Sequence, residues 1–207
     1  MRNYSQNNEQ EIILNHFRER ATPGRFLDIG AYNGPDLSNT YALLELGWSG
    51  VLVEPNPYNL VQLMESTRKF GKRASIVACA IGDPTPCLQR LRLDDAAARG
   101  RGWAASLVES NPGVMEESPT ALYVPVFDVE AVKGFGPFDF ISIDAEWMDA
   151  VILEQFTPDD LVICRMLIIE PGGPDGASTR DSMKASLRTK GFNPDIYATP
   201  ENVIAIK

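Results

Sequence analysis

The chain alternates between short apolar runs and longer segments in which apolar residues recur every three or four positions. A short run that is apolar at nearly every position is typical of a strand buried on both faces. Recurrence every three or four positions is typical of a helix with one buried side. We therefore predict strands at Phe26–Ile29, Val51–Glu54, Ser75–Ile81, Phe138–Ile143 and Met166–Ile169. The predicted helices cover 8–20, a segment capped by Asp36, 58–70, 148–156, and a segment capped by Ser178.

This alternation predicts an α/β fold with a doubly wound, mostly parallel sheet. The last two apolar runs, Phe192–Ala198 and Val203–Ile206, predict a closing antiparallel hairpin. We expect a single domain over residues 1–207, in which residues 1–22 form an N-terminal helical arm. In sheets of this kind, ligands bind beyond the carboxyl ends of the strands. A site is therefore expected in the loops after Ile29, Val53, Ile81, Ile143 and Ile169.

The alternation is interrupted over residues 94–121, a long stretch flanked by two strand candidates, Leu88–Leu93 and Leu122–Val126. A loop of this length inside a compact domain is usually functional, so we interpret it as an insertion on the substrate side. Trp103, Ser106 and the nearby arginines could grip a substrate. A plain surface excursion is the alternative interpretation.

The composition is that of an acidic globular protein, with a formal net charge of -9. This charge argues against nucleic acid as the main partner, because binding to a phosphate backbone needs clustered Lys and Arg. The local basic group of Arg90, Arg92, Arg99 and Arg101 could still meet an anionic substrate. No apolar run approaches the roughly 20 residues of a membrane span, and the N-terminus lacks the apolar core of a signal peptide. The 3 cysteines include no CxxC pair, which favours a reduced, cytoplasmic setting.

The first predicted strand leads into a turn in which Gly30 and Gly34 are spaced G-x-x-x-G. A dinucleotide-binding turn needs G-x-G-x-x-G so that the backbone can approach a pyrophosphate, and here Tyr32 occupies the middle position. Asp28 would repel a phosphate, but it suits the sulfonium and ammonium of S-adenosylmethionine. Glu54 ends the second strand, where a carboxylate can accept hydrogen bonds from both ribose hydroxyls. The turn and the acid together predict S-adenosylmethionine binding by a Rossmann-like unit.

Several segments of the sequence resemble the FkbM-type S-adenosylmethionine-dependent methyltransferases. The segments are Tyr4–Ile13 (YSQNNEQEII), Phe26–Gly34 (FLDIGAYNG), Leu37–Tyr41 (LSNTY), Leu46–Pro57 (LGWSGVLVEPNP) and Phe140–Glu146 (FISIDAE). The resemblance runs from about Tyr4 to Pro171, and the stretch after Leu93 matches poorly. It implies methylation of hydroxyl oxygens on polyketides, sugars and related metabolites.

The resemblance also implies contacts to the cofactor from the first turn, from Glu54, and from Ala80 and Ile81 beside the adenine. Ser5 and Gln6 belong to the shared N-terminal pattern and would fold over the cofactor, and a solvent-exposed arm is the alternative. The candidate cofactor-binding residues are Gln6, Asp28, Gly30, Ala31, Tyr32, Asn33, Gly34, Glu54, Pro55, Ala80, Ile81 and Asp144.

The sequence departs from the family pattern after the fourth predicted strand. The family usually reads Asp-Val-Glu-Gly there, and this chain reads Asp144-Ala-Glu-Trp147. Both acids are kept, but a bulky indole replaces the glycine that lets the backbone approach the site. The identity of the methyl acceptor is therefore left open by the resemblance.

Asp144 and Glu146 are the candidate catalytic residues. On an extended chain, side chains two residues apart share one face, so both acids can reach the same ligand. One of them can take the proton of an acceptor hydroxyl, or both can position the loop without a chemical role. With Glu170 they could instead form an all-oxygen Mg²⁺ site. Asp149 is interpreted as the start of the following helix, and His16 as an ordinary helix residue.

We predict a cytoplasmic S-adenosylmethionine-dependent O-methyltransferase that acts on a sugar or another small molecule. The sequence is also compatible with a homodimer. An NAD-dependent oxidoreductase is disfavoured, because the middle glycine and a Tyr-x-x-x-Lys pair are missing. A non-catalytic relative that binds the cofactor or a partner protein is kept open by Trp147.

Overall fold

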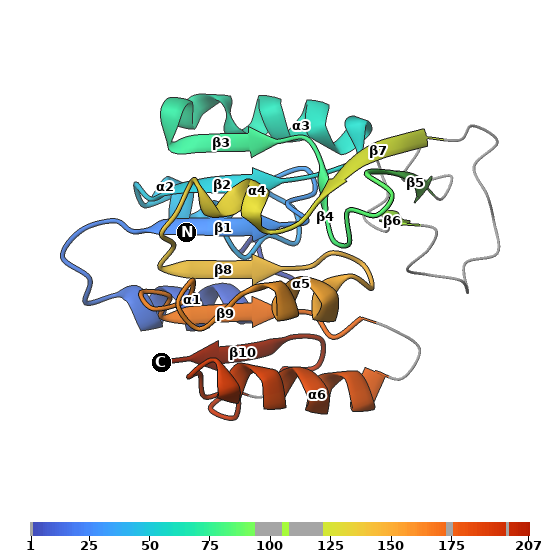
Figure 1. The fold of residues 1–207 in the computed structure, drawn as a ribbon. Helices are drawn as coiled ribbons and strands as arrows, with labels where there is room; N and C mark the ends of the chain where they lie inside the picture. The colour runs from blue at the N-terminus through green and yellow to red at the C-terminus, as the bar shows by residue number, and fades with distance from the viewer. Residues whose placement is uncertain (1, 94–104, 108–121, 173–175, 198) are drawn as a thin grey trace.

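The computed structural model describes residues 2–93, 105–107, 122–172, 176–197 and 199–207 of the chain. A 6-stranded sheet runs through the centre in the order β10-β9-β8-β1-β2-β3 (Figure 1). All neighbouring strands are parallel except β10, which runs antiparallel to β9. The strands are β1 (Arg25–Ile29), β2 (Ser49–Val53), β3 (Ala74–Val77), β8 (Phe140–Ile143), β9 (Met166–Ile169) and β10 (Val203–Ile206).

Helices cover both faces of this sheet because successive strand residues point to opposite sides. Phe26 packs in one apolar cluster with α1, α2 and α3, whereas Leu27 packs in a second cluster with α4, α5 and α6. The doubly wound, mostly parallel architecture is thus confirmed. The helices are α1 (Glu9–Phe17), α2 (Tyr41–Glu45), α3 (Pro57–Thr67) with the 3₁₀ helix η1 (Arg68–Arg73), α4 (Glu130–Lys133), α5 (Asp149–Gln155) and α6 (Gly176–Thr189).

A second, 4-stranded sheet lies beyond the carboxyl ends of the central strands, in the order β4-β7-β5-β6 (Figure 1). Strand β7 pairs parallel with β4 and antiparallel with β5, and β6 pairs antiparallel with β5. Because of this position, the small sheet stands at the edge where a ligand is expected. Its strands are β4 (Ala80–Ile81), β5 (Leu88–Leu93), β6 (Ala105–Leu107) and β7 (Leu122–Phe127).

The structure corrects two of the strand predictions. The apolar run Ser75–Ile81 is not one strand. Strand β3 ends at Val77, whose carbonyl accepts a hydrogen bond from Cys79 N at 3.2 Å. Ala80 and Ile81 then join the second sheet as β4. Residues 105–107 within the predicted loop form β6. Both errors have one cause, since pattern alone does not show which sheet an apolar segment joins.

Three further predictions fail at the ends of elements. Asp36 does not cap a helix, because the chain turns through Leu37 at a φ of 57° and α2 begins only after Thr40. The predicted strand Phe192–Ala198 makes a single bridge, Asn193 to Ile206, so the antiparallel partner of β10 is β9. The predicted cap at Ser178 is also wrong, because α6 already begins at Gly176 and Ser178 lies within its first turn. In the described part of the chain, no helix is long and apolar enough to cross a membrane.

Candidate functional site

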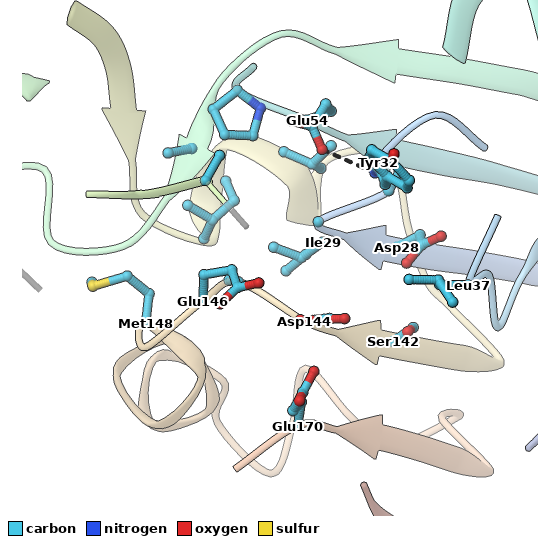
Figure 2. A pocket seen from close by; sticks show the side chains of 18 of the residues that line it. Asp28, Ile29, Tyr32, Leu37, Glu54, Ser142, Asp144, Glu146, Met148 and Glu170 are labelled. Atoms are coloured by element: carbon cyan, nitrogen blue, oxygen red, sulfur yellow. Dashed lines mark hydrogen bonds between the residues drawn. The ribbon is translucent and has the colours of Figure 1, made fainter. Parts of the chain in front are cut away.

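A cavity of about 300 Å³ opens at the carboxyl ends of β1, β2, β8 and β9, beneath the second sheet (Figure 2). It lies where the chain order reverses, because β2 continues from β1 on one side and β8 pairs with β1 on the other. Open α/β sheets bind their ligands at this switch point, and the volume is in the range of small-molecule sites. The cavity is therefore the candidate active site.

Two glycines shape the turn after β1, for different reasons. Gly30 has a φ of 90°, and a Cβ added to it would lie 1.7 Å from the carbonyl oxygen of Asp144. Only glycine therefore lets the end of β1 touch the chain that leaves β8. Gly34 has a φ of 97°, and its added Cβ would meet Ser66 Oγ on α3 at 2.6 Å. Gly34 thus packs the turn against α3.

Asp28 lies at the base of the cavity, next to Ser142 of the neighbouring strand in register. Its side chain is buried and accepts a hydrogen bond of 2.5 Å from Thr40 Oγ1. Burial raises the pKa of Asp28 to about 6, although the hydroxyls of Thr40 and Ser142 oppose this shift. The carboxyl group therefore remains largely ionised at neutral pH.

Glu54 is held rigidly at the end of β2. Its Oε2 accepts from Tyr32 N at 2.9 Å (Figure 2). Its Oε1 accepts from Asn56 N at 2.8 Å and from Asn59 Nδ2 at 3.4 Å. A carboxylate oxygen has two acceptor positions, so Oε2 keeps one for a ligand in the cavity. Burial raises the pKa of Glu54 to about 7 despite these hydrogen bonds.

Three further carboxyl groups line the cavity at the ends of β8 and β9: Asp144, Glu146 and Glu170 (Figure 2). Burial, followed by the charge of Glu170, raises the pKa of Asp144 well above its ordinary value. The same two causes raise the pKa of Glu146 to about 7. Asp144 and Glu146 therefore bind protons more tightly than exposed carboxyl groups do, which is expected of groups that transfer protons.

Asp149 has a structural role and begins α5, as predicted. It is buried, and its two carboxylate oxygens accept from Ala145 N at 2.8 Å and Trp147 N at 3.1 Å. Burial raises its pKa to about 7. These bonds fix the loop that carries the two candidate catalytic acids.

That loop contains two non-glycine residues in the left-handed region. Glu146 has a φ of 46° and Trp147 a φ of 82°. Glycine adopts such angles without strain, so the family glycine at position 147 has a backbone explanation. Trp147 is not among the residues that line the cavity.

Most of the predicted site residues come together. The cavity is lined by Gln6, Asp28, Gly30, Ala31, Tyr32, Glu54, Pro55, Ala80, Ile81, Asp144, Glu146 and Glu170. Asn33 and Gly34 stand behind this surface: Asn33 Nδ2 donates to Asp36 Oδ2 at 2.9 Å, and Asn33 O accepts from Ser66 Oγ at 2.8 Å. Both residues shape the turn.

The remaining candidates lie elsewhere. Ser5 is buried beside the cavity, and Ser106 is buried in β6, but neither lines the cavity. His16 is half-buried in α1, and its ring meets the Phe17 ring edge-on at 4.7 Å. Trp103, Arg99 and Arg101 lie outside the described residues.

Sequence reasoning missed one whole wall of the cavity. Two features of the sequence could have identified some of the missed residues. The motif Leu37–Tyr41 contains three of them, and Ser142 lies two residues before Asp144, on the same face of the strand. Leu91, Ala105 and Leu107 of the second sheet gave no such signal, because their strands look like ordinary apolar segments. The missed lining residues are Ile29, Asp36, Leu37, Ser38, Asn39, Val53, Cys79, Leu91, Ala105, Leu107, Ser142, Ala145 and Met148.

The predicted alternative of a Mg²⁺ site finds no support in the geometry. Within the described ranges, no three His, Cys, Asp or Glu side chains are arranged so that they could hold a metal ion. Asp144 and Glu146, whose pKa values are raised, are therefore the candidate proton-transfer groups.

Comparison with protein families gives one match over most of the chain. A model of the Methyltransferase FkbM domain matches residues 28–193, which include both candidate catalytic acids and Glu54. No curated protein gives a significant match.

Comparison with solved structures shows the fold. The FkbM methyltransferase of Methylobacillus flagellatus KT aligns with a TM-score of 0.53 at 15% identity, over 93% of this chain and 46% of that one. An S-adenosylhomocysteine-bound methyltransferase of Podospora anserina aligns with a TM-score of 0.53 at 14% identity, over 98% and 79%. The precorrin-6y C5,15-methyltransferase of Geobacter metallireducens GS-15 aligns with a TM-score of 0.51 at 12% identity, over 100% and 92%. This chain thus spans less than half of the first of these proteins, 46% of its length.

Proposed function

Since this chain belongs to the Methyltransferase FkbM domain family, we propose that it transfers a methyl group from S-adenosylmethionine to a hydroxyl of a sugar or another small molecule. The observation that carries the proposal is the placement of Glu54. Its buried carboxylate is fixed by backbone N–H groups at the end of β2 and keeps an acceptor position toward the cavity. A ribose hydroxyl is a suitable donor for that position.

The charge of the cavity supports this donor. Six carboxyl groups line it, from Asp28, Asp36, Glu54, Asp144, Glu146 and Glu170, and the described lining includes no Lys, Arg or His. When bound, S-adenosylmethionine supplies a methyl group on a cationic sulfur. An acid-rich, desolvated wall favours such a cation more strongly than the same acids would in water. It disfavours the phosphates of a dinucleotide.

The two candidate catalytic acids suit different roles in this reaction. Glu146 has a pKa of about 7, which is close to the best value for a general base at neutral pH. Burial and the charge of Glu170 raise the pKa of Asp144 well above its ordinary value, so Asp144 can also donate a hydrogen bond to an acceptor. We assign removal of the acceptor proton to Glu146, and orientation of the acceptor to Asp144.

The direct test is methyl transfer to a panel of hydroxylated sugars and metabolites, followed as release of S-adenosylhomocysteine. We expect turnover with at least one hydroxyl acceptor. The Glu146→Gln variant should lose about 100-fold in turnover, because general base catalysis contributes about 10²–10⁴-fold. Its affinity for S-adenosylhomocysteine should stay near that of the wild type.

Two results would contradict these assignments. Full turnover of Glu146→Gln would remove Glu146 as the base. Tight binding of S-adenosylhomocysteine with no turnover across the panel would favour the non-catalytic relative, which the strained Trp147 suggests.

A further inference from the structure

The segment before α1 contributes Gln6 to the lining of the cavity. Gln6 lines the cavity and is exposed, while its neighbours Tyr4 and Ser5 on one side and Glu9 and Gln10 on the other are buried. Among the described residues, the Gln6 carboxamide has no hydrogen-bond partner. A polar side chain held in place by buried neighbours and facing a cavity is available for a ligand.

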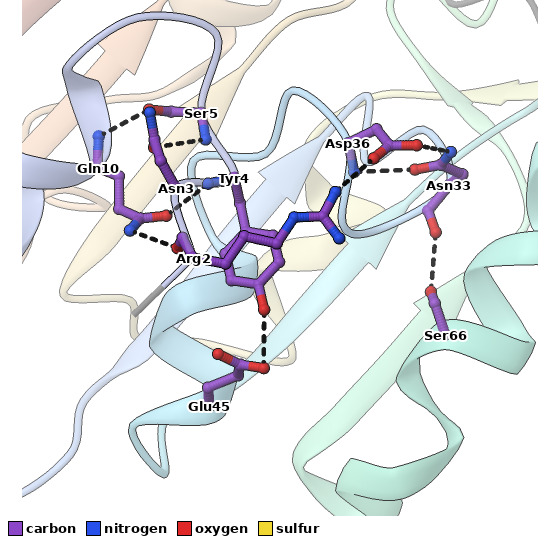
Figure 3. Close-up of polar contacts among 9 residues, drawn as sticks. All are labelled: Arg2, Asn3, Tyr4, Ser5, Gln10, Asn33, Asp36, Glu45 and Ser66. Carbon is purple, nitrogen blue, oxygen red and sulfur yellow. Dashed lines mark hydrogen bonds and ion pairs between the residues drawn. The ribbon is translucent and has the colours of Figure 1, made fainter.

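Gln10 anchors the upstream side of this segment, as Figure 3 shows. Its Oε1 accepts from Tyr4 N at 2.8 Å, its Nε2 donates to Arg2 O at 2.9 Å, and its N donates to Ser5 Oγ at 3.1 Å. We define residues 2–7 as the strap. One buried glutamine thus binds three residues of the strap, Arg2, Tyr4 and Ser5. Since buried amides are costly to leave unpaired, these bonds hold the strap in a single path.

The strap is also tied to the wall of the cavity. Tyr4 O accepts from Ser38 N at 2.8 Å, and Ser38 is itself a lining residue. The Tyr4 hydroxyl donates to Glu45 Oε1 at 2.9 Å, and its ring lies 4.9 Å from the Tyr41 ring of α2. The exposed ion pair between Arg2 and Asp36 adds little, because water screens it.

Glu9 anchors the downstream side. Its side chain is fully buried and accepts from Asn7 N at 2.8 Å and from Asn7 Nδ2 at 3.2 Å. It also accepts from Asn202 Nδ2 at 3.1 Å, in the loop before β10. Glu9 and Gln10, adjacent in the first turn of α1, therefore clamp the strap on both sides of Gln6.

We propose that Glu9 and Gln10 are positioning residues for the methyl donor, which act by holding the Gln6 carboxamide over the cavity. This inference rests on the proposed function. A carboxamide both donates and accepts, so it can bind the carboxylate and the ammonium at the amino-acid end of S-adenosylmethionine. The carboxylate of that end needs N–H donors, and among the described lining residues only Gln6 and Asn39 have side chains with N–H groups.

A double-mutant cycle on S-adenosylhomocysteine affinity, measured by calorimetry, tests the proposal. Gln6→Ala should weaken binding about three- to tenfold, the value of one hydrogen bond. Gln10→Ala should weaken binding by a similar factor. The double variant should bind S-adenosylhomocysteine no more weakly than whichever single variant has the lower affinity, because Gln10 acts through Gln6. Gln10→Glu, which keeps the acceptor for Tyr4 N, should recover part of the loss.

The matched control is Glu11→Ala, an exposed residue of the same helical turn, which should leave affinity unchanged. Thermal unfolding of each variant shows whether the protein is folded. Unchanged affinity in a folded Gln10→Ala variant, or additive losses in the double variant, would overturn the clamp alone. No uptake of S-adenosylhomocysteine by the wild type would overturn the proposed function and the clamp together.

Discussion

Glu54 combines features that are rarely found in one carboxyl group of a folded protein. It is buried, yet it receives three hydrogen bonds that favour its charge, and the balance leaves its pKa at about 7. The role proposed for it needs the ionised form, because a protonated carboxyl group would donate one of the bonds that it should accept. Ligand binding and proton binding at Glu54 therefore compete.

This competition predicts a pH dependence. Affinity for S-adenosylhomocysteine should fall about tenfold between pH 8 and pH 6, as protons occupy a group whose free pKa is about 7. Glu54→Gln should bind more weakly at pH 8 and show a smaller slope, since the neighbouring acids still titrate. Glu65→Gln, an exposed acid on α3, is the control. If the affinity of Glu54→Gln falls with decreasing pH as steeply as that of the wild type, Glu54 is not the group that causes the pH dependence.

Three of the acids that sequence reasoning found lie at or directly after the ends of parallel strands. Asp28, Glu54 and Asp144 stand where parallel strands deliver their next side chains to a common edge, and all three line the cavity. Asn33 and Gly34 look equivalent in the motif, but they face α3 through Ser66. The motif fixes the turn without showing which of its residues face the ligand.

At the scale of single elements, the backbone of the loop between β8 and α5 favours glycine at a position where the sequence has tryptophan. The Asp149 carboxylate holds this loop in place by accepting hydrogen bonds from two of the loop's backbone N–H groups. Within the loop, Trp147 adopts a φ of 82°. A side chain in this region costs about 1–2 kcal/mol relative to glycine. Conflicts of this kind gather at functional sites, where the surrounding structure enforces them.

Comparing two substitutions at position 147 isolates this cost. Trp147→Gly and Trp147→Ala both remove the indole contacts, but only glycine relieves the positive φ. We expect the glycine variant to have a free energy of unfolding about 1 kcal/mol higher than the alanine variant, as measured by chemical denaturation. An alanine variant that is the more stable of the two would show that the loop is not strained.

The second sheet shows why elements were easier to predict than their partners. The apolar pattern predicts the strands that begin at Leu88 and Leu122. It does not separate β4 from β3, because the apolar run continues from one strand into the other. The bond from Cys79 N to Val77 O, which ends β3, leaves no mark in the pattern of apolar residues. The pattern therefore indicates a substrate-side insertion over 94–121 but does not show that Leu91, Ala105 and Leu107 line the cavity.

Across the whole molecule, the net charge of -9 and the cluster of buried acids both make the folded protein less stable as the pH rises. Asp28 has a pKa of about 6, and Glu54, Glu146 and Asp149 have pKa values of about 7, all raised first by burial. Each group binds its proton more tightly in the folded state than in the unfolded chain, where carboxyl groups titrate near pH 4. Their contribution to stability is full below about pH 4 and is lost as the pH rises through 6 to 7.

The melting temperature of the ligand-free protein should therefore fall as the pH rises from 5 to 8, as measured by calorimetry or dye fluorescence. Glu146→Gln should show a smaller fall, because it removes one of the titrating groups. S-adenosylmethionine should raise the melting temperature most at pH 8, since it binds the ionised acids. A melting temperature that rises from pH 5 to pH 8 would mean that these carboxyl groups are not held protonated in the folded protein.

The central claim, that the cavity at the ends of β1 and β2 takes up an S-adenosyl ligand, is tested most directly by titrating the wild-type protein with S-adenosylhomocysteine in a calorimeter. The account predicts saturable binding of one ligand per chain, weakened about ten- to a hundredfold in Glu54→Ala, the value of a charge-assisted hydrogen bond. No saturable heat from the wild type, or equal affinity in Glu54→Ala, would contradict it.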